Sequence, residues 1–352
     1  KGSAVIRMAS AKKPSFRDCR MACDVDGKSF KNHIKVGFSA DEIQPYTQMP
    51  SDFREFWDGV LERQKQLPME VTVADAPEFS SEKFDCYLIK IRTWRRETRA
   101  YVYGYLTVPK GGKGKYPIVV SPPGAGVKPM TPSKTQFYAT DGQCMRFEME
   151  IHGIDPSLSA ATYGDITRAF GDHFAAGYLS NGISDRDRYY MRHVYGGMVA
   201  AMRYLQSLPE WDGRNLAVQG GSQGGALALI TAALCKDVTL CVANHPALTD
   251  MAGYAEKGRT GGYPNWKNSG ILTPQSIKTL AYYDVINFCR YVKCPVRMTW
   301  GYNDFTCSPT TSYAAWNTLS CPKEPFITPI NEHWTSETME RQHMEWIKSK
   351  LK

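Results

Sequence analysis

The chain has 352 residues, and its 43 Lys and Arg against 35 Asp and Glu give a formal net charge of +8. Hydrophobic residues make up 42% and charged residues 22%, a balance that is typical of globular proteins and excludes an intrinsically disordered chain. No stretch approaches the ~18 consecutive apolar residues of a membrane-spanning helix. The sequence also lacks a long run of basic residues of the kind that indicates nucleic-acid binding.

The first 45 residues are expected to form a β-rich extension. The turn sequence Asp26-Gly27 lies between alternating runs, of which 33–38 is the clearest, and this pattern predicts a β-hairpin. Because a lone hairpin is only marginally stable, it should pack on the main body or end an upstream β domain. We therefore divide the chain into an extension, 1–45, and a main domain, 46–352. No signal-peptide pattern is visible at the start of the sequence.

The main domain is expected to open with a helix that is followed by antiparallel strands. Ser51 or Asp52 can cap a helix in which Phe56, Val60 and Leu61 recur at helical spacing. Residues 84–108 then alternate between apolar and polar side chains, which predicts two or three antiparallel strands.

From residue 116 onward, short apolar runs alternate with predicted helices. Such runs are typical of strands that are buried on both faces, and their alternation with helices predicts a mostly parallel sheet flanked by helices, the α/β class. The predicted strands are 117–120, 216–218, 240–243, 296–300 and 325–328, and the predicted helices are 189–207, 226–234 and 335–350.

The strongest local signal is the glycine-rich stretch 220–225, which contains G-x-S-x-G between a predicted strand and a predicted helix. A nucleophile elbow requires that context, because the turn is so tight that side chains at Gly220 and Gly224 would clash. The hydroxyl is then exposed at the carboxyl edge of the sheet, beside a helix N-terminus that favours negative charge. We therefore predict that Ser222 is a nucleophile.

A serine nucleophile needs a base, and in this fold class the chain order is serine, acid, histidine. Only His245, His333 and His343 follow Ser222. His343 lies inside the last predicted helix and is interpreted as a surface residue, whereas His245 precedes any plausible acid. His333 lies in a loop between the last predicted strand and the last helix, and it is the predicted base.

The orienting acid should follow the fourth strand of the predicted parallel sheet. Gly301 turns the chain there, and Asp304 is the predicted acid. Its neighbour Asn303 is the alternative, but it carries no charge with which to stabilise an imidazolium. For the oxyanion hole we predict the backbone N–H groups of Gln223 and Ala125. This chemistry needs neither a metal nor an organic cofactor.

From about residue 50 to residue 350, the chain resembles the acetyl xylan esterase / cephalosporin-C deacetylase family of α/β-hydrolases, carbohydrate esterase family 7. The sequence G-S-Q-G-G at 221–225 matches the family's elbow, and the segment 50–57 resembles its P-x-D-F-x-x-F-W opening. Further resemblance lies in the helix before the elbow and in the C-terminal blocks, at 189–209, 283–288, 293–296, 301–304 and 314–317.

This resemblance implies an α/β-hydrolase fold and a serine esterase that removes O-acetyl groups from xylan or xylo-oligosaccharides. The family's nucleophile, acid and base then fall on Ser222, Asp304 and His333. The implied partner is an acetylated carbohydrate, and the implied assembly is a hexameric homo-oligomer. Two alternatives are a broader carboxylesterase or peptidase and a catalytically silent carbohydrate-binding protein on the same fold.

Two stretches depart from the family pattern and bear on substrate preference. The family's H-G-Y oxyanion stretch is replaced by Pro-Pro-Gly-Ala at 122–125, and its R-G-Q-G motif by 151–155, which has neither the Arg nor the Gln. Residues 1–45 lie outside the family core and resemble the end of an upstream β domain found in some gut-bacterial relatives. That resemblance favours a periplasmic or secreted location over a cytoplasmic one.

Overall fold

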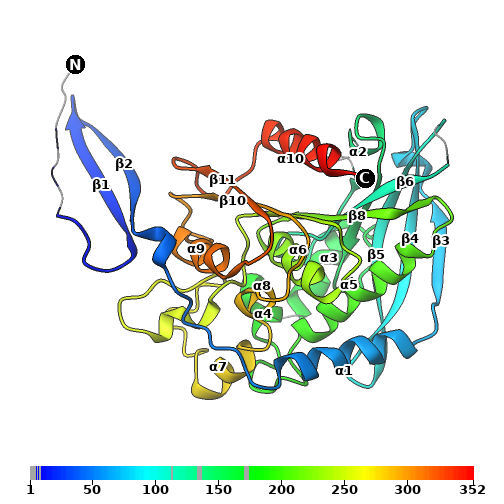
Figure 1. Cartoon of the computed structure of the whole chain (residues 1–352), viewed down its shortest axis with the longest axis horizontal. Coiled ribbons are helices and arrows are strands. Elements are labelled where there is room, and N and C mark those ends of the chain that lie inside the picture. Colours follow the sequence, from blue (N-terminus) through cyan, green and yellow to red (C-terminus); the bar gives the residue numbers. More distant parts are fainter. Residues whose placement is uncertain (1–4, 6, 8, 112–113, 133–136, 170–173) are drawn as a thin grey trace.

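A mixed nine-stranded sheet forms the centre of the computed structural model, which describes residues 5, 7, 9–111, 114–132, 137–169 and 174–352 (Figure 1). In spatial order its strands are β11 (Lys323–Thr328), β10 (Val296–Gly301), β9 (Leu240–Asn244), β8 (Trp211–Gly221), β6 (Tyr116–Ser121), β7 (Met145–Glu150), β5 (Thr98–Pro109), β4 (Phe84–Arg95) and β3 (Val71–Asp75). Strands β6 to β11 are mutually parallel, whereas β3, β4 and β5 run antiparallel to their neighbours.

Helices cover both faces of this sheet (Figure 1). They are α1 (Phe53–Gln66), α2 (Phe137–Thr140), α3 (Ala160–Ala169), α4 (Phe174–Ser180), α5 (Met191–Gln206), α6 (Gln223–Leu234), α7 (Pro274–Leu280), α8 (Val285–Cys289), α9 (Pro309–Thr318) and α10 (Glu337–Lys350). Within the described ranges, none of them combines the length and the apolar character that crossing a bilayer requires.

Neighbouring residues of the inner strands point into two separate apolar layers, as the pleat of a strand demands. On β6, Ile118 and Val120 join a large cluster with α1, α5, α6 and α8, while Val119 points the other way, to α2 and α10. Burial on both faces explains why these strands are short continuous apolar runs in the sequence.

The strand predictions for the main domain are confirmed with two omissions, β3 and β7. Residues 84–108 form β4 and β5, and the five short apolar runs form β6, β8, β9, β10 and β11. The strand β7 is absent from the predicted elements, although its residues alternate between apolar and charged side chains. Its Arg146 and Glu148 stay largely buried because they pair with each other, with 3.4 Å between Nε and Oε1.

The predicted N-terminal hairpin is also confirmed. Strands β1 (Ser15–Val25) and β2 (Lys28–Phe38) pair in antiparallel register around Asp26 and Gly27, whose φ angles of 50° and 74° are those of a tight hairpin turn. The hairpin projects from the body beside β10 and β11 (Figure 1). At its base, Phe16 packs on Tyr302, with 5.1 Å between the ring centroids.

Two predictions about helix side chains are wrong. Asp52 occupies the N-cap position of α1 but makes no capping hydrogen bond, because its carboxylate instead accepts one from Arg186, with 2.6 Å between Nη1 and Oδ2. His343 is 0% exposed and not a surface residue. It lies between Met339 and Ile347 at intervals of one helical turn, and that side of α10 faces the sheet.

Candidate active site

Ser222 lies in the turn between β8 and α6, with a positive φ of 59° that is unfavourable for a residue with a side chain. Glycine is required on both sides of it, because a Cβ on Gly220 would collide with the backbone of Gly224, and one on Gly224 with the carbonyl oxygen of Pro122. The Ser222 N–H donates to the carbonyl oxygen of Asn244 at 2.9 Å, which ties the turn to the end of β9. These are the features of a nucleophile elbow.

Three side chains that are far apart in the sequence meet at this turn. His333 Nε2 lies 3.0 Å from Ser222 Oγ, and His333 Nδ1 lies 2.7 Å from Asp304 Oδ2. Because an ionised carboxylate only accepts, Nδ1 carries the hydrogen, and Nε2 is left to accept the hydroxyl proton of Ser222. The structure therefore brings together the three residues predicted as nucleophile, acid and base.

Asp304 is fully buried but its carboxylate is surrounded by donors. The second oxygen, Oδ1, accepts from the N–H groups of Thr306 and Cys307, both at 2.8 Å. A carboxylate held by several N–H groups is stabilised in its charged form, which is the form that orients a histidine.

The hairpin reaches the same loop from outside the sheet. Lys35 on β2 donates from Nζ to the main-chain oxygen of Asp304 at 2.6 Å. Asn303, the alternative acid, does not contact the base; its Oδ1 accepts the N–H of Lys35 at 2.9 Å. Burial lowers the pKa of Lys35, and the nearby carboxylates of Asp18 and Asp304 oppose that shift. Nothing in the local sequence around Lys35 indicates this contact.

The loop after β6 packs against the elbow through one tyrosine. The N–H of Gly126 donates to the hydroxyl of Tyr178 at 3.2 Å, and that hydroxyl donates to Oε1 of Gln223 at 2.7 Å. Ala125 directly precedes Gly126, so the two segments that carry the predicted oxyanion donors are held together by this bridge. The donor roles of Gln223 and Ala125 stay predictions.

The stretch that replaces the R-G-Q-G motif supports the same loop. His152 lies 3.3 Å through Nε2 from the carbonyl oxygen of Gly126 and 2.7 Å through Nδ1 from the hydroxyl of Tyr190. Because a carbonyl oxygen only accepts, Nε2 carries the hydrogen and Nδ1 accepts from the tyrosine. Burial lowers the pKa of His152 to about 4, which keeps this arrangement neutral.

Two more side chains touch the predicted triad. The ring centroid of His245 lies 4.4 Å from that of His333, and burial, followed by the charge of His333, lowers the pKa of His245 to about 4. Cys307 is buried, and its thiol lies close enough to Ser222 to influence its pKa. Burial raises the pKa of that thiol, so it stays protonated. The position of His245 directly after β9, at the carboxyl edge, is the signal that could have placed it here.

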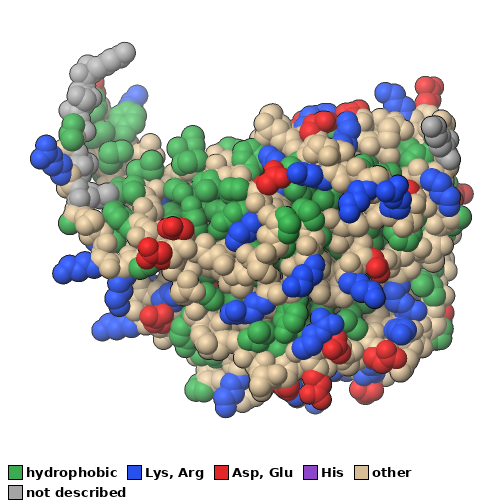
Figure 2. All heavy atoms as spheres, viewed as in Figure 1, with side chains coloured by type: hydrophobic (Ala, Val, Ile, Leu, Met, Phe, Trp, Pro, Cys, Tyr) green, Lys and Arg blue, Asp and Glu red, His purple; other side chains and the backbone are tan. Residues whose placement is uncertain are grey.

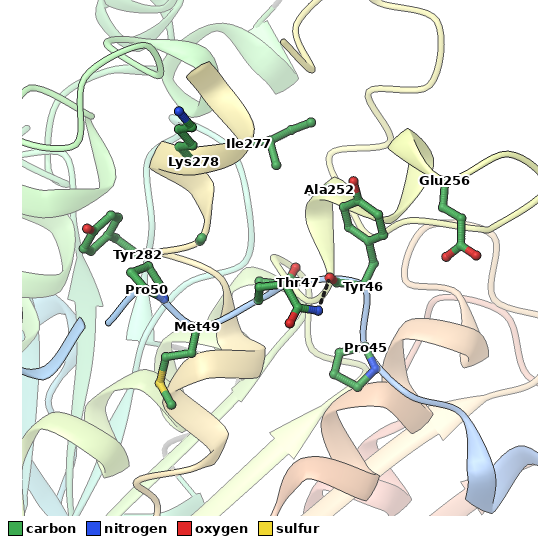
Figure 3. Close-up of a pocket in the computed structure, with 12 residues that line it drawn as sticks. Pro45, Tyr46, Thr47, Met49, Pro50, Ala252, Glu256, Ile277, Lys278 and Tyr282 are labelled. Atoms are coloured by element: carbon green, nitrogen blue, oxygen red, sulfur yellow. Dashed lines mark hydrogen bonds between the residues drawn. The ribbon is translucent and has the colours of Figure 1, made fainter. Parts of the chain in front are cut away.

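A sizeable cavity lies elsewhere in the fold (Figure 3). It measures about 660 Å³ and is lined by the linker 45–50, by residues of the 3-10 helix Met251–Ala255 and by α7, and none of the three triad side chains lines it. Among the described residues, no group of three or more His, Cys, Asp or Glu side chains is placed to hold a metal ion.

Comparisons with known proteins agree with this geometry. Residues 37–350 match the family described as acetyl xylan esterase (AXE1). Acetyl esterase Axe7A of Xylanibacter ruminicola is 51% identical over 353 residues, a match that spans 100% of this chain and 78% of that protein.

Two solved acetyl xylan esterases share the fold with a TM-score of 0.74 each. The one from Paenibacillus sp. R4 has 24% identity over 89% of this chain and 98% of that chain. The one from Thermoanaerobacterium sp. JW/SL YS485 has 21% identity over 88% and 97%. The chain therefore belongs to the acetyl xylan esterase family, which consists of carboxylic ester hydrolases with the α/β-hydrolase fold.

Proposed function

We propose that the chain is a serine esterase that removes acetyl groups from acetylated xylan or xylo-oligosaccharides. The observation that carries the proposal is the unbroken hydrogen-bonded line from Ser222 through His333 to the buried Asp304. The acetyl and xylan parts of the proposal are supported by the family match and by the 51% identical acetyl esterase.

The geometry defines the order of the chemical steps. Ser222 Oγ attacks the acetyl carbonyl carbon while its proton passes to His333 Nε2, and Asp304 stabilises the resulting imidazolium. The N–H groups of Gln223 and Ala125 receive the negative charge that develops on the carbonyl oxygen. His333 then returns the proton to the sugar oxygen as its bond to the acetyl carbon breaks. Water, deprotonated by His333, attacks the acetyl-serine and releases acetate.

The test is acetate release from acetylated xylo-oligosaccharides by the wild type and by Ser222→Ala. We expect kcat to fall by a factor on the order of 10⁴ or more, because the nucleophile is lost. Ser349→Ala, which removes an exposed hydroxyl from α10, is the matched control and should be fully active. A fluorophosphonate probe should label the wild type at Ser222 and leave Ser222→Ala unlabelled.

Three outcomes would contradict the proposal. Acetate release at the wild-type rate by Ser222→Ala would remove the nucleophile from the mechanism. A wild type that neither reacts with fluorophosphonate nor releases acetate would favour a silent carbohydrate-binding protein, and a strong preference for acyl chains longer than acetyl would favour a broader esterase.

A further inference from the structure

An open hollow of about 520 Å³ lies between the N-terminal hairpin and the loop that carries Asp304. One wall is Phe305, and the other is formed by residues 20–22 of β1 and 31–33 of β2. The family match begins at residue 37, so the hairpin wall comes from outside the matched region. Its position beside β10 and β11 places it next to the loops of the active site (Figure 1).

The walls of the hollow contact two loops, the one that carries Asp304 and the one that carries His333. Phe305 directly follows Asp304 in the chain. On the hairpin, the ring of His33 packs on Phe305 with 4.7 Å between the centroids, and its Nε2 lies 3.6 Å from Oε1 of Glu332. Glu332 directly precedes His333, so the hairpin wall contacts chain neighbours of two members of the triad.

The chemistry of the walls fits a neutral polyhydroxylated ring. Phe305 is 51% exposed, although Lys35 Nζ lies 3.9 Å from its ring centroid. The exposed part of the ring can bury the C–H face of a pyranose, because the face of an aromatic ring is apolar and carries partial negative charge. On the opposite wall, Lys31 and Asn32 carry N–H donors for hydroxyl groups, whereas Arg20 is paired with Asp18 and its guanidinium lies 5.9 Å from the centroid of the Phe305 ring. Pockets that combine an apolar wall with a few polar groups are typical of small-molecule sites.

The apolar surface continues from the hollow onto the base loop. Trp334, which follows His333, is 50% exposed, and Ile330 on the same loop is 73% exposed. Apolar side chains also gather beside the hairpin on the face seen in Figure 2. A chain of linked sugars, unlike a single acetylated sugar, can contact several exposed side chains of this kind at once.

We propose that the hollow between the hairpin and Phe305 is a subsite for the sugar chain of an acetylated xylo-oligosaccharide. This inference rests on the proposed function, since it assigns the part of the substrate that lies beyond the reacting acetyl group. It makes the hairpin a determinant of substrate length, and it makes Phe305 the aromatic platform of the subsite.

The test compares two substrates on the same variants. Phe305→Ala should raise KM for acetylated xylo-oligosaccharides about tenfold or more beyond any change that it causes for 4-nitrophenyl acetate, because the small ester does not reach the subsite. Phe30→Ala is the matched control, since Phe30 is 55% exposed on the hairpin but does not line the hollow. Lys31→Ala is a second variant that does not touch the Asp304 loop, and it should raise KM for the oligosaccharide alone, by about twofold to fivefold.

Three other outcomes would contradict the proposal that the hollow is a sugar subsite. Unchanged oligosaccharide kinetics in both Phe305→Ala and Lys31→Ala would show that the hollow binds no sugar. Parallel losses on both substrates in Phe305→Ala, with no effect of Lys31→Ala, would mean that Phe305 only supports the acid loop. An equal effect of Phe30→Ala would assign the change to the hairpin as a whole. In all three cases the Ser222→Ala experiment still reports on the proposed function, so the two failures are distinguishable.

Discussion

Lys35 donates a 2.6 Å hydrogen bond from its ammonium group to the main-chain oxygen of Asp304, across 269 residues of sequence. The lysine comes from the N-terminal hairpin, before the matched family region, and the aspartate is the predicted catalytic acid. The same lysine also contacts Phe305, so the hairpin holds the acid loop at two consecutive residues. The position of the predicted acid thus depends on an element outside the region that defines the family.

Replacing Lys35 should reduce turnover without preventing folding. Lys35→Met removes the ammonium group but keeps much of the apolar stem, so the acid loop loses one of its anchors. We expect kcat for 4-nitrophenyl acetate to fall about 10-fold to 100-fold with little change in KM, because small displacements of catalytic groups are costly. Lys28→Met at the exposed tip of the hairpin is the control. Equal activity of the two variants would show that the anchor is dispensable.

The hydroxyl of Tyr178 should matter for both stability and rate. Tyr178→Phe leaves the N–H of Gly126 and Oε1 of Gln223 without this shared partner, at a cost of about 1–3 kcal/mol in the free energy of unfolding. Because Ala125 and Gln223 are the predicted oxyanion donors, kcat should also fall, by about tenfold or more. Denaturant melts and steady-state kinetics measure the two effects. Tyr87→Phe on β4 should change neither, and a Tyr178→Phe enzyme with wild-type kcat would contradict the link to the oxyanion loop.

The elbow should not tolerate a methyl group at Gly224. In Gly224→Ala the new Cβ would collide with the carbonyl oxygen of Pro122, which is backbone and cannot rotate away. We expect labelling by a fluorophosphonate to be lost, together with a lower midpoint of thermal unfolding. Gly59→Ala is the control, because a Cβ at Gly59 meets nothing within 4 Å and lies in α1, where alanine is favoured by about 1 kcal/mol. Normal labelling of Gly224→Ala would refute this account of the turn.

Stability should fall in mild acid because several histidines are buried. Burial, followed by the charges of Arg297 and His245, lowers the pKa of His343 from 6.5 to about 3. As pH falls below 6.5, the unfolded chain takes up a proton that the folded chain does not, so the free energy of unfolding decreases by about 1.4 kcal/mol per pH unit for this one group. In His343→Leu the slope between pH 6.5 and 4 should be shallower by that amount. Urea titrations at several pH values measure it, and equal slopes for variant and wild type would disprove it.

The elements that the sequence predicts well are those with a local signature. The elbow is contained in six consecutive residues, and the chain order of the fold then leaves His333 and Asp304 as base and acid. The family prediction is confirmed by the match over 37–350. Strands buried on both faces are short apolar runs, and β6, β8, β9 and β10 are recognisable for that reason, whereas β11 lies at the edge of the sheet and is only partly buried.

The features that the sequence does not predict are contacts between residues that lie far apart along the chain. The hydrogen bond of His152 to the carbonyl oxygen of Gly126 joins residues 26 positions apart and has no local signal in the sequence. The contact of Lys35 with Asp304 is equally without a local signal. His343 is a different case, because its spacing to Met339 and Ile347 already indicated a buried helix face.

The distance along the chain between the hairpin and the loop it holds has a consequence for synthesis in the cell. Translation delivers the hairpin before the acid loop, and a further 269 residues must be synthesised before Asp304 can meet Lys35. The base comes later still. A nascent or prematurely terminated product that contains the elbow but not His333 would therefore be inert, and hydrolytic competence would arise only after the segment that carries the base has been synthesised.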